Sequence, residues 1–421
     1  MGASAVPETI DCNPEIPIDN FPKLSKQALT GILGEIVELA CENSEASPAA
    51  VFFTALTFAA ASIGAISYFP VGDTRHPARF FACIVGESAR ARKGTSSHPV
   101  ERIFQEAQEL HKLPLLPVTP GPFSSGEGII NAVRDPSEIL KKGAPIDMGV
   151  SDKRLLGLLG EFGGTLSTMT RDGSTLSSVL RTAWETGNIK PLTKLSQIKT
   201  TGAHINFVGH ITKQELQHLL STSDIWNGLA NRILWVCAKR EKLVPVSEPM
   251  NAEKVRTIAT KLGTALTFAQ KAGRIIFNQE AEAEWKRLYP EITSDKPGVF
   301  GVITARAEAQ IVRLAMVYAM LDQSYFIELQ HLKAALSAWE YCEQSARYLF
   351  GSAHENPRVL KVIKALESGP KSTTALHHVF GRNMSGEELK SILTDMENQQ
   401  LITSRQDGKS ARIYKLIDND N

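Results

Sequence analysis

The sequence predicts an α/β protein in which helices cover a mostly parallel sheet, followed by a helical block and a compact C-terminal domain. Three observations predict this class. Between residues 80 and 245, short apolar runs alternate with helical patterns, which is typical of parallel strands joined by helices. From about 250 to 350, apolar residues recur at helical spacing in long segments. The tail from Arg358 predicts three short helices and a β-hairpin, the pattern of a winged helix.

The composition is that of a globular protein with reduced thiols. A length of 421 residues allows two or three domains, and a formal net charge of +1 gives no global indication of a nucleic-acid partner. The cysteines are widely separated, without C-x-x-C pairs or histidines at metal-ligand spacing: Cys12, Cys41, Cys83, Cys237 and Cys342. We therefore expect a cytoplasmic protein without a zinc site.

The N-terminal region predicts a tail followed by two helices. Residues 1–21 are acidic and lack the features of a signal peptide, and residues 22–79 form a helical segment whose second helix begins near Pro48. No charge occurs in residues 49–69, which is a length that would suit a membrane span. Small residues dominate it, and no basic clusters or aromatic belts flank it, so we expect a buried core helix and no membrane contact.

The remaining elements follow in order. We expect a core at 80–245 with strands at 80–85, 155–159, 204–209 and 233–238, a helical domain at 246–350 and the winged-helix-like domain at 357–421. Core helices are expected after residues 94–97, near residue 126, at 175–184 and at 213–220.

The stretch "FACIVGESARARKGTSSHPVERIF" has the layout of a phosphate-binding loop. A strand ends at Gly86, a short basic loop leads to Lys93 and Gly94, and Thr95 and Ser96 open a helix. Backbone N–H groups and the helix N-terminus attract phosphates, a lysine adds charge, and a hydroxyl can bind Mg²⁺.

The spacing of this loop differs from the usual phosphate-loop pattern, which leaves two registers. If Arg92 takes the lysine position, Lys93 falls where the hydroxyl belongs and cannot bind Mg²⁺. If Lys93 is the phosphate lysine, the loop is one residue longer and Thr95 or Ser96 supplies the hydroxyl. We favour the second register, because every chemical role is filled; the alternative to a site is a basic surface turn.

Acidic residues follow two of the expected strands. Glu161 ends the apolar strand of "DKRLLGLLGEF", where nucleotide hydrolases hold Mg²⁺ or orient water, although Gly160 stands where a second acid is common. Glu127 is a further candidate near the γ-phosphate, but a favourable charge in the first turn of a helix explains it better.

Two later positions are candidates for nucleotide contact. His210 and Thr212 end the strand of "AHINFVGHIT" and can sense a γ-phosphate, although helix capping alone would explain Thr212. Arg232 precedes an apolar strand, and either acts as an arginine finger toward a neighbouring subunit or forms a buried salt bridge.

Candidate DNA contacts lie in the tail and in one core segment. The third helix of the tail is acidic, so its hairpin is the better DNA-binding element, with four basic residues: Arg405, Lys409, Arg412 and Lys415. Lys190, Lys194 and Lys199 follow the helix ending near Trp184 and form either a DNA-tracking loop or a solvated hairpin.

These motifs together resemble a P-loop ATPase family of phages, plasmids and genomic islands, whose members are often fused to primase–polymerase domains and are described as helicase-like. The matching stretches lie between about residues 21 and 245: "GESARARKGTS", "SSGEGIINAVRD", "DKRLLGLLGEF", "GSTLSSVLRTAWETG", "LTKLSQIKTTGAHINFVGHIT" and "NGLANRILWV". The family resemblance implies a RecA/AAA+-like core that binds ATP and Mg²⁺ and acts on single-stranded or forked DNA in replication of a mobile element.

The same resemblance implies roles for individual residues. It assigns Gly86, Lys93, Gly94, Thr95 and Ser96 to the phosphates and Mg²⁺, Glu161 to the acidic strand end, and Arg232 to the finger. It also implies a homo-oligomer, with a hexameric ring as one form, and a primase supplied by a separate protein. The alternative is a nucleotide-binding initiator or loader, or a DNA-binding module, with weak or no hydrolysis.

Overall fold

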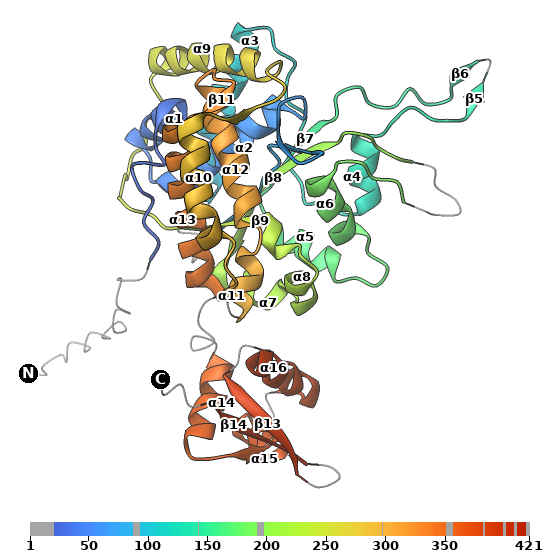
Figure 1. The fold of residues 1–421 in the computed structure, drawn as a ribbon, viewed down its shortest axis with the longest axis vertical. Helices are drawn as coiled ribbons and strands as arrows, with labels where there is room; N and C mark the ends of the chain where they lie inside the picture. Colours follow the sequence, from blue (N-terminus) through green and yellow to red (C-terminus); the bar gives the residue numbers. More distant parts are fainter. Residues whose placement is uncertain are drawn as a thin grey trace, which may run out of the picture.

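A five-stranded parallel sheet forms the centre of the molecule, in the order β4-β7-β8-β3-β9 (Figure 1). The computed structural model describes residues 21–86, 93–141, 143–191, 198–296, 298–350, 357–381, 384–398, 401–407 and 411–417. The strands are β3 (Phe81–Gly86), β4 (Val118–Thr119), β7 (Arg154–Leu159), β8 (His204–Thr212) and β9 (Ile233–Ala238). The predicted parallel sheet is therefore confirmed, and it is compatible with a Rossmann- or RecA-like α/β core. Of the predicted tail, all but Phe21 lies outside the described residues.

The first face of the sheet is covered by α2 (Pro48–Ile63), which packs across β7, β8, β3 and β9. Around α2 lie α1 (Gly31–Glu42), α3 (Ser97–Leu110), α9 (Ala252–Ala269) and α12 (Ala307–Leu321). Every residue of α2 from Ala49 to Ile63 is buried, which explains why this stretch carries no charge. The expected core helix is confirmed, and no helix in the described ranges is long and apolar enough to cross a membrane.

The opposite face carries a second hydrophobic core, built mainly by shorter helices. These are α4 (Gly126–Ala132), α5 (Phe162–Met169), α6 (Leu176–Glu185), α7 (Lys213–Leu219) and α8 (Thr222–Trp226). Strands β3 and β9 are buried along their whole length and β8 along all but its last residue, as expected for parallel strands with both faces covered. The sequence did not predict the two-residue edge strand β4, nor α5 and α8.

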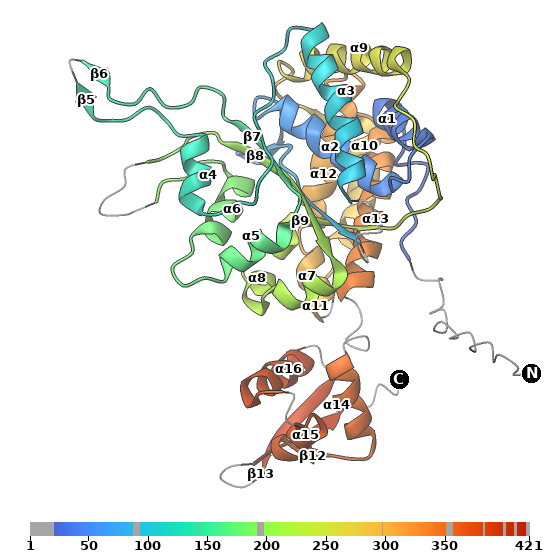
Figure 2. The same ribbon diagram turned by 180° about the vertical axis from the view of Figure 1, so that it is seen from behind.

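The helical block predicted after residue 250 is present. Besides α9 and α12 it contains α10 (Gln279–Ile292), α11 (Gly298–Thr304) and α13 (Leu329–Phe350), with a small pair of parallel strands, β10 (Ile276–Phe277) and β11 (Phe326–Ile327). Two hairpins were not predicted: β1 (Tyr68–Val71) with β2 (Thr74–Pro77), and β5 (Leu140–Lys141) with β6 (Ala144–Pro145). Figure 2 shows the second hairpin at the end of an arm that projects from the sheet domain.

A cluster of arginines around Trp184 joins the sheet domain to the helical block. Arg313 of α12 is fully buried, its guanidinium lies 3.6 Å from the centroid of the Trp184 ring, and it donates hydrogen bonds to the backbone oxygens of Arg79 and Trp184. Arg79 donates in turn to the backbone oxygens of Glu185 and Thr186. Carbonyls at the C-terminal end of α6 thus stabilise buried positive charge.

The C-terminal part has its own hydrophobic core. It contains α14 (Pro357–Glu367), α15 (Thr373–Val379) and α16 (Gly386–Asn398), and a three-stranded antiparallel sheet of β12 (Lys371–Ser372), β14 (Ala411–Leu416) and β13 (Ile402–Asp407), in that order. Three helices and a hairpin are what the sequence predicted for this region, and β12 adds a strand to the hairpin.

His204 predicts an acid-sensitive fold. Its Nε2 lies 2.9 Å from the backbone oxygen of Ala60, and burial, together with Arg79, Arg154 and Arg313, lowers the imidazole pKa from 6.5 to about 3. Between that value and the unfolded pKa of about 6.5, only the unfolded chain takes up the proton. The contribution of His204 to the free energy of unfolding is therefore fully present above pH 6.5. It decreases as the pH is lowered, and about 2 kcal/mol of it is lost at pH 5.

Urea unfolding at pH 7 and pH 5 measures this contribution. We expect the wild type to lose about 2 kcal/mol more than His204→Gln over this pH range, because the variant has no imidazole to protonate. His98→Gln serves as the control, since the His98 side chain is 84% exposed. Equal pH dependence in wild type and His204→Gln would contradict the prediction.

Candidate functional site

The carboxyl ends of β3 and β8 form a topological switch point. From β3 the chain passes through α3, on the face of α2, to the far edge strand β4. The helices that follow β4, β7 and β8 lie on the opposite face. The helices after the neighbouring strands β3 and β8 leave on opposite faces, and at the carboxyl ends of such strands α/β proteins of this kind bind ligands in a crevice.

The two described ends of the predicted phosphate loop lie at this switch point. Gly86 is the buried last residue of β3 and pairs with Thr212 of β8. Residues 87–92 lie outside the described residues, and the chain resumes in a 3-10 turn, Lys93–Ser96, that continues directly into α3. The side chain of Lys93 is also outside the described part, whereas Thr95 is exposed and Ser96 is buried. The described backbone has a strand before the loop and a turn and helix after it, which both registers share.

His210 connects the start of α3 with the end of β8. Its Nε2 lies 3.4 Å from Ser97 Oγ, and its side chain is buried. Thr212, two residues further on, is the N-cap of α7 and accepts a hydrogen bond from the Glu215 amide at 3.1 Å. At the end of β8, the His210 side chain therefore lies near the helix that follows the predicted loop, and Thr212 caps the next helix.

Two carboxylates stand at the same edge of the sheet. Glu161 is exposed at the N-cap of α5, directly after β7. Glu215, in the first turn of α7, turns its carboxylate toward Gly163 of α5, where a Cβ atom would lie only 2.0 Å from Glu215 Oε1. A larger residue at position 163 would therefore require the exposed Glu215 side chain to move. Because β7 and β8 are neighbouring strands, Glu215 lies at the same edge of the sheet as Glu161. Sequence reasoning missed Glu215, whose only local signal is the spacing T-x-x-E after the strand.

Two predicted residues are not brought to this crevice. Glu127 lies in the first turn of α4, behind edge strand β4, and accepts a hydrogen bond from Thr175 Oγ1 at 2.9 Å. Arg232 precedes β9 at the amino edge of the sheet, opposite the edge of Gly86 and about five residues or 17 Å along the strands. There its guanidinium binds Glu185 at 2.9 Å.

The ion pair of Arg232 matches the salt-bridge alternative for this residue. Its side chain is 10% exposed, and Nη1 also donates to the Gly228 oxygen at 2.5 Å. Burial is the main cause that lowers its pKa, with neighbouring Arg306 adding to the effect, while Glu185 opposes it. Any contact with a neighbouring subunit would require the Arg232 side chain to leave these partners.

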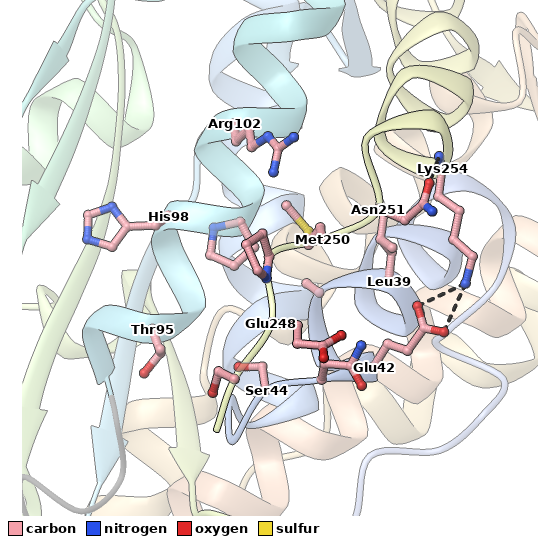
Figure 3. A pocket seen from close by; sticks show the side chains of 15 residues that line it. Leu39, Glu42, Ser44, Thr95, His98, Arg102, Glu248, Met250, Asn251 and Lys254 are labelled. Atoms are coloured by element: carbon pink, nitrogen blue, oxygen red, sulfur yellow. Dashed lines mark hydrogen bonds and ion pairs between the residues drawn. The ribbon is translucent and has the colours of Figure 1, made fainter. Parts of the chain in front are cut away.

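A cavity of about 580 Å³ lies beside the first turns of α3 (Figure 3). Three parts of the chain line the cavity. They are the start of α3 with the turn before it (Thr95, His98 and Arg102), the end of α1 with the residues after it (39–44), and the start of α9 with the segment before it (247–254). Its size lies in the range of small-molecule sites. Thr95 therefore borders this cavity, while Ser97, two residues later, contacts His210 at the crevice.

The cavity walls are held together by ion pairs between distant segments. Lys254 Nζ lies 2.9 Å from both carboxylate oxygens of Glu42 (Figure 3), and Lys261 pairs with Glu35 between the same two helices. Two basic and two acidic residues line the cavity, Arg102 and Lys254 with Glu42 and Glu248, so their formal charges balance. Sequence reasoning missed these residues, because they come from three separate parts of the chain and carry no local motif.

The expected Mg²⁺ would find oxygen donors at the predicted positions. Thr95, Ser96 and Glu161 offer hydroxyl and carboxylate oxygens, and Mg²⁺ is commonly held by one or two carboxylates together with substrate phosphates. Within the ranges the structure covers, no group of three or more His, Cys, Asp or Glu side chains could hold a metal alone.

The predicted DNA contacts of the tail lie on its hairpin. Arg405 and Lys415 are exposed and share the face of the hairpin that points away from the buried Tyr414, whereas Arg412 alternates to the other face. Lys409 lies outside the described residues, as does Lys194 of the core segment. Lys190 and Lys199 stand at the base of the projecting arm.

Comparison with models of known protein families gives no match for this chain. Comparison with curated proteins gives none either.

Proposed function

We propose that this protein binds ATP with Mg²⁺ at the carboxyl edge of β3 and hydrolyses it to act on DNA as a cytoplasmic, helicase-like homo-oligomer in the replication of a mobile element. The observation that carries the nucleotide part is the course of the chain at the switch point. A buried strand, a short turn with hydroxyl residues and a helix start meet a polar strand end, and a cavity adjoins them. A helix N-terminus in that position favours phosphate.

The residues divide into those that bind and those that react. In the proposed site, the Lys93 side chain and the amides of the turn bind phosphate oxygens, and Thr95 or Ser96 holds the metal, which would neutralise phosphate charge. Glu161 orients the attacking water, with Glu215 as a second carboxylate at the same edge. His210, held near Ser97, is suited to contact the γ-phosphate. The cavity beside α3 receives the nucleoside.

A second candidate is an initiator or loader that binds ATP and hydrolyses it weakly. The observation favouring it is Gly160, which leaves Glu161 without an acidic neighbour in sequence. Weak hydrolysis with nucleotide-dependent DNA binding is the signature that separates this candidate from a motor.

Calorimetric titration with Mg-ATP tests the nucleotide proposal. We expect the wild type to bind in the micromolar range and Ser247→Trp, which fills the cavity, to bind at least about tenfold more weakly. Val246→Trp is the matched control, because the adjacent Val246 is 82% exposed and does not line the cavity. No heat of binding for the wild type, or equal affinity of Ser247→Trp, would overturn the assignment.

A further inference from the structure

A projecting arm between α4 and β7 is braced at its base by polar contacts. The Arg134 guanidinium binds both carboxylate oxygens of Asp147, at 2.6 and 3.1 Å. Asp135 accepts from Lys153 Nζ at 2.8 Å and from Thr201 Oγ1 at 2.7 Å. These contacts fix the arm, residues 134–153, to the sheet domain, so its direction is a built feature of the fold.

The same contacts join the arm to the lysine-bearing segment 186–203. Thr200 Oγ1 donates to the Val133 oxygen at 2.6 Å, and the Asp135 amide donates to the Lys199 oxygen at 2.8 Å. Lys199 also forms an ion pair with Glu138 of the arm. Lys199 and Thr200 therefore lie beside the base of the arm.

The tip of the arm exposes aliphatic side chains. Strands β5 and β6 pair Leu140 with Pro145, and the Ile146 amide donates to the Ile139 oxygen at 3.0 Å, so Ile139 and Ile146 stand opposite each other on one face. The exposed fractions are 52% for Ile139, 62% for Leu140 and 57% for Ile146. An isolated two-stranded hairpin is marginally stable in water, and Figure 2 shows this one at the end of the arm, away from the sheet.

The charge left at this surface is positive. The acids between residues 136 and 150 are Glu138 and Asp147, and both are ion-paired at the base of the arm. Their lysine and arginine partners hold both carboxyl pKa values below the ordinary range, so the pairs persist at neutral pH. Segment 186–203 contains three lysines and no acid. Lys141 is exposed in the tip hairpin, and Lys190 is exposed near the base of the arm.

We propose that this arm binds double-stranded DNA, inserting the Ile139–Ile146 ribbon into a groove while Lys141 and Lys190 contact the backbone phosphates. This inference rests on the proposed action on DNA. A groove admits a two-stranded ribbon, and aliphatic side chains act as wedges between base steps. No aromatic residue occurs in 134–153, whereas proteins that bind single strands stack bases on aromatic rings.

Fluorescence anisotropy with a labelled 30-base-pair duplex tests the arm in the full chain. We expect the double substitution Ile139→Ser with Ile146→Ser to weaken binding at least about tenfold. Lys141→Gln is expected to lower the slope of log affinity against log salt by about one. The controls are Leu243→Ser and Lys271→Gln, which change exposed residues outside the arm and are expected to leave binding unchanged.

The outcomes separate this proposal from the nucleotide proposal. Loss of duplex binding with unchanged Mg-ATP affinity supports the arm. Unchanged duplex binding in the arm variants overturns it. Tighter binding of a single strand of equal length, weakened by the same substitutions, overturns it as well. A change in sedimentation mass without a change in DNA binding overturns it in favour of contact between copies of the chain. If the wild type binds no DNA, both the arm and the action on DNA fail, while ATP binding stands.

Discussion

Lys93→Ala is expected to weaken Mg-ATP binding about tenfold to a hundredfold and to abolish turnover. The substitution removes the charged donor assigned to the phosphates, and a hydrogen bond to a charged group contributes roughly 1.5–3 kcal/mol. Glu161→Gln should behave differently: it keeps the affinity for ATP and lowers the hydrolysis rate about a hundredfold or more, because the carboxylate acts on the water.

Calorimetry and a phosphate-release assay with and without DNA measure the two variants side by side. Arg171→Ala, an exposed arginine after α5, serves as a charge control. Robust turnover in both variants would remove the proposed site. Normal ATP affinity in Lys93→Ala would instead favour the register in which Arg92 takes the lysine position.

Arg313→Ala is expected to lower the free energy of unfolding by about 4 kcal/mol. The guanidinium is fully buried, and its loss leaves the Arg79 and Trp184 oxygens without these donors and opens a void over the Trp184 ring. Urea unfolding of the full chain measures the change. Arg313→Met, which restores much of the volume but no donor, should recover part of the loss.

Arg306→Ala is the matched control for this cluster. Arg306 pairs with Glu185 at 3.5 Å, but both side chains are about a third exposed. Exposed pairs contribute about 1 kcal/mol or less, so a small effect is expected. If Arg313→Ala and Arg306→Ala destabilise equally, the buried guanidinium does not join the sheet domain to the helical block as we describe.

Continuous apolar runs made the interior strands predictable from sequence. Strand β9 has the predicted bounds, and β3, β7 and β8 differ from theirs by at most three residues at either end. The two-residue strand β4 and the β5–β6 hairpin were not predicted, because neither has an apolar run or a periodic pattern. The periodic spacing of apolar residues reflects burial. Elements that lie at the edge of a sheet or project into solvent therefore show little of this spacing.

The candidate site was predictable only where it is local in sequence. Gly86 and the helix start after Lys93 follow from one stretch of chain, and His210 from the end of a strand. Glu42 and Lys254 meet only in the folded protein, and the pairing of Arg232 with Glu185 likewise depends on tertiary packing. Sequence order places strand ends at one edge of a sheet, but it does not say which distant helices close the space beside them.

The position of α2 sets a limit on how this protein can be divided. Its apolar side chains fill the space between the sheet and the surrounding helices α1, α9 and α12. They therefore contact both the sheet and the helices that cover it. A fragment that begins at β3 would lack α2 and would expose to water the parts of β7, β8, β3 and β9 that this helix covers. Expression of the nucleotide core for structural work should therefore start before α1, and a protease that cuts between α2 and β1 should leave two pieces that stay associated.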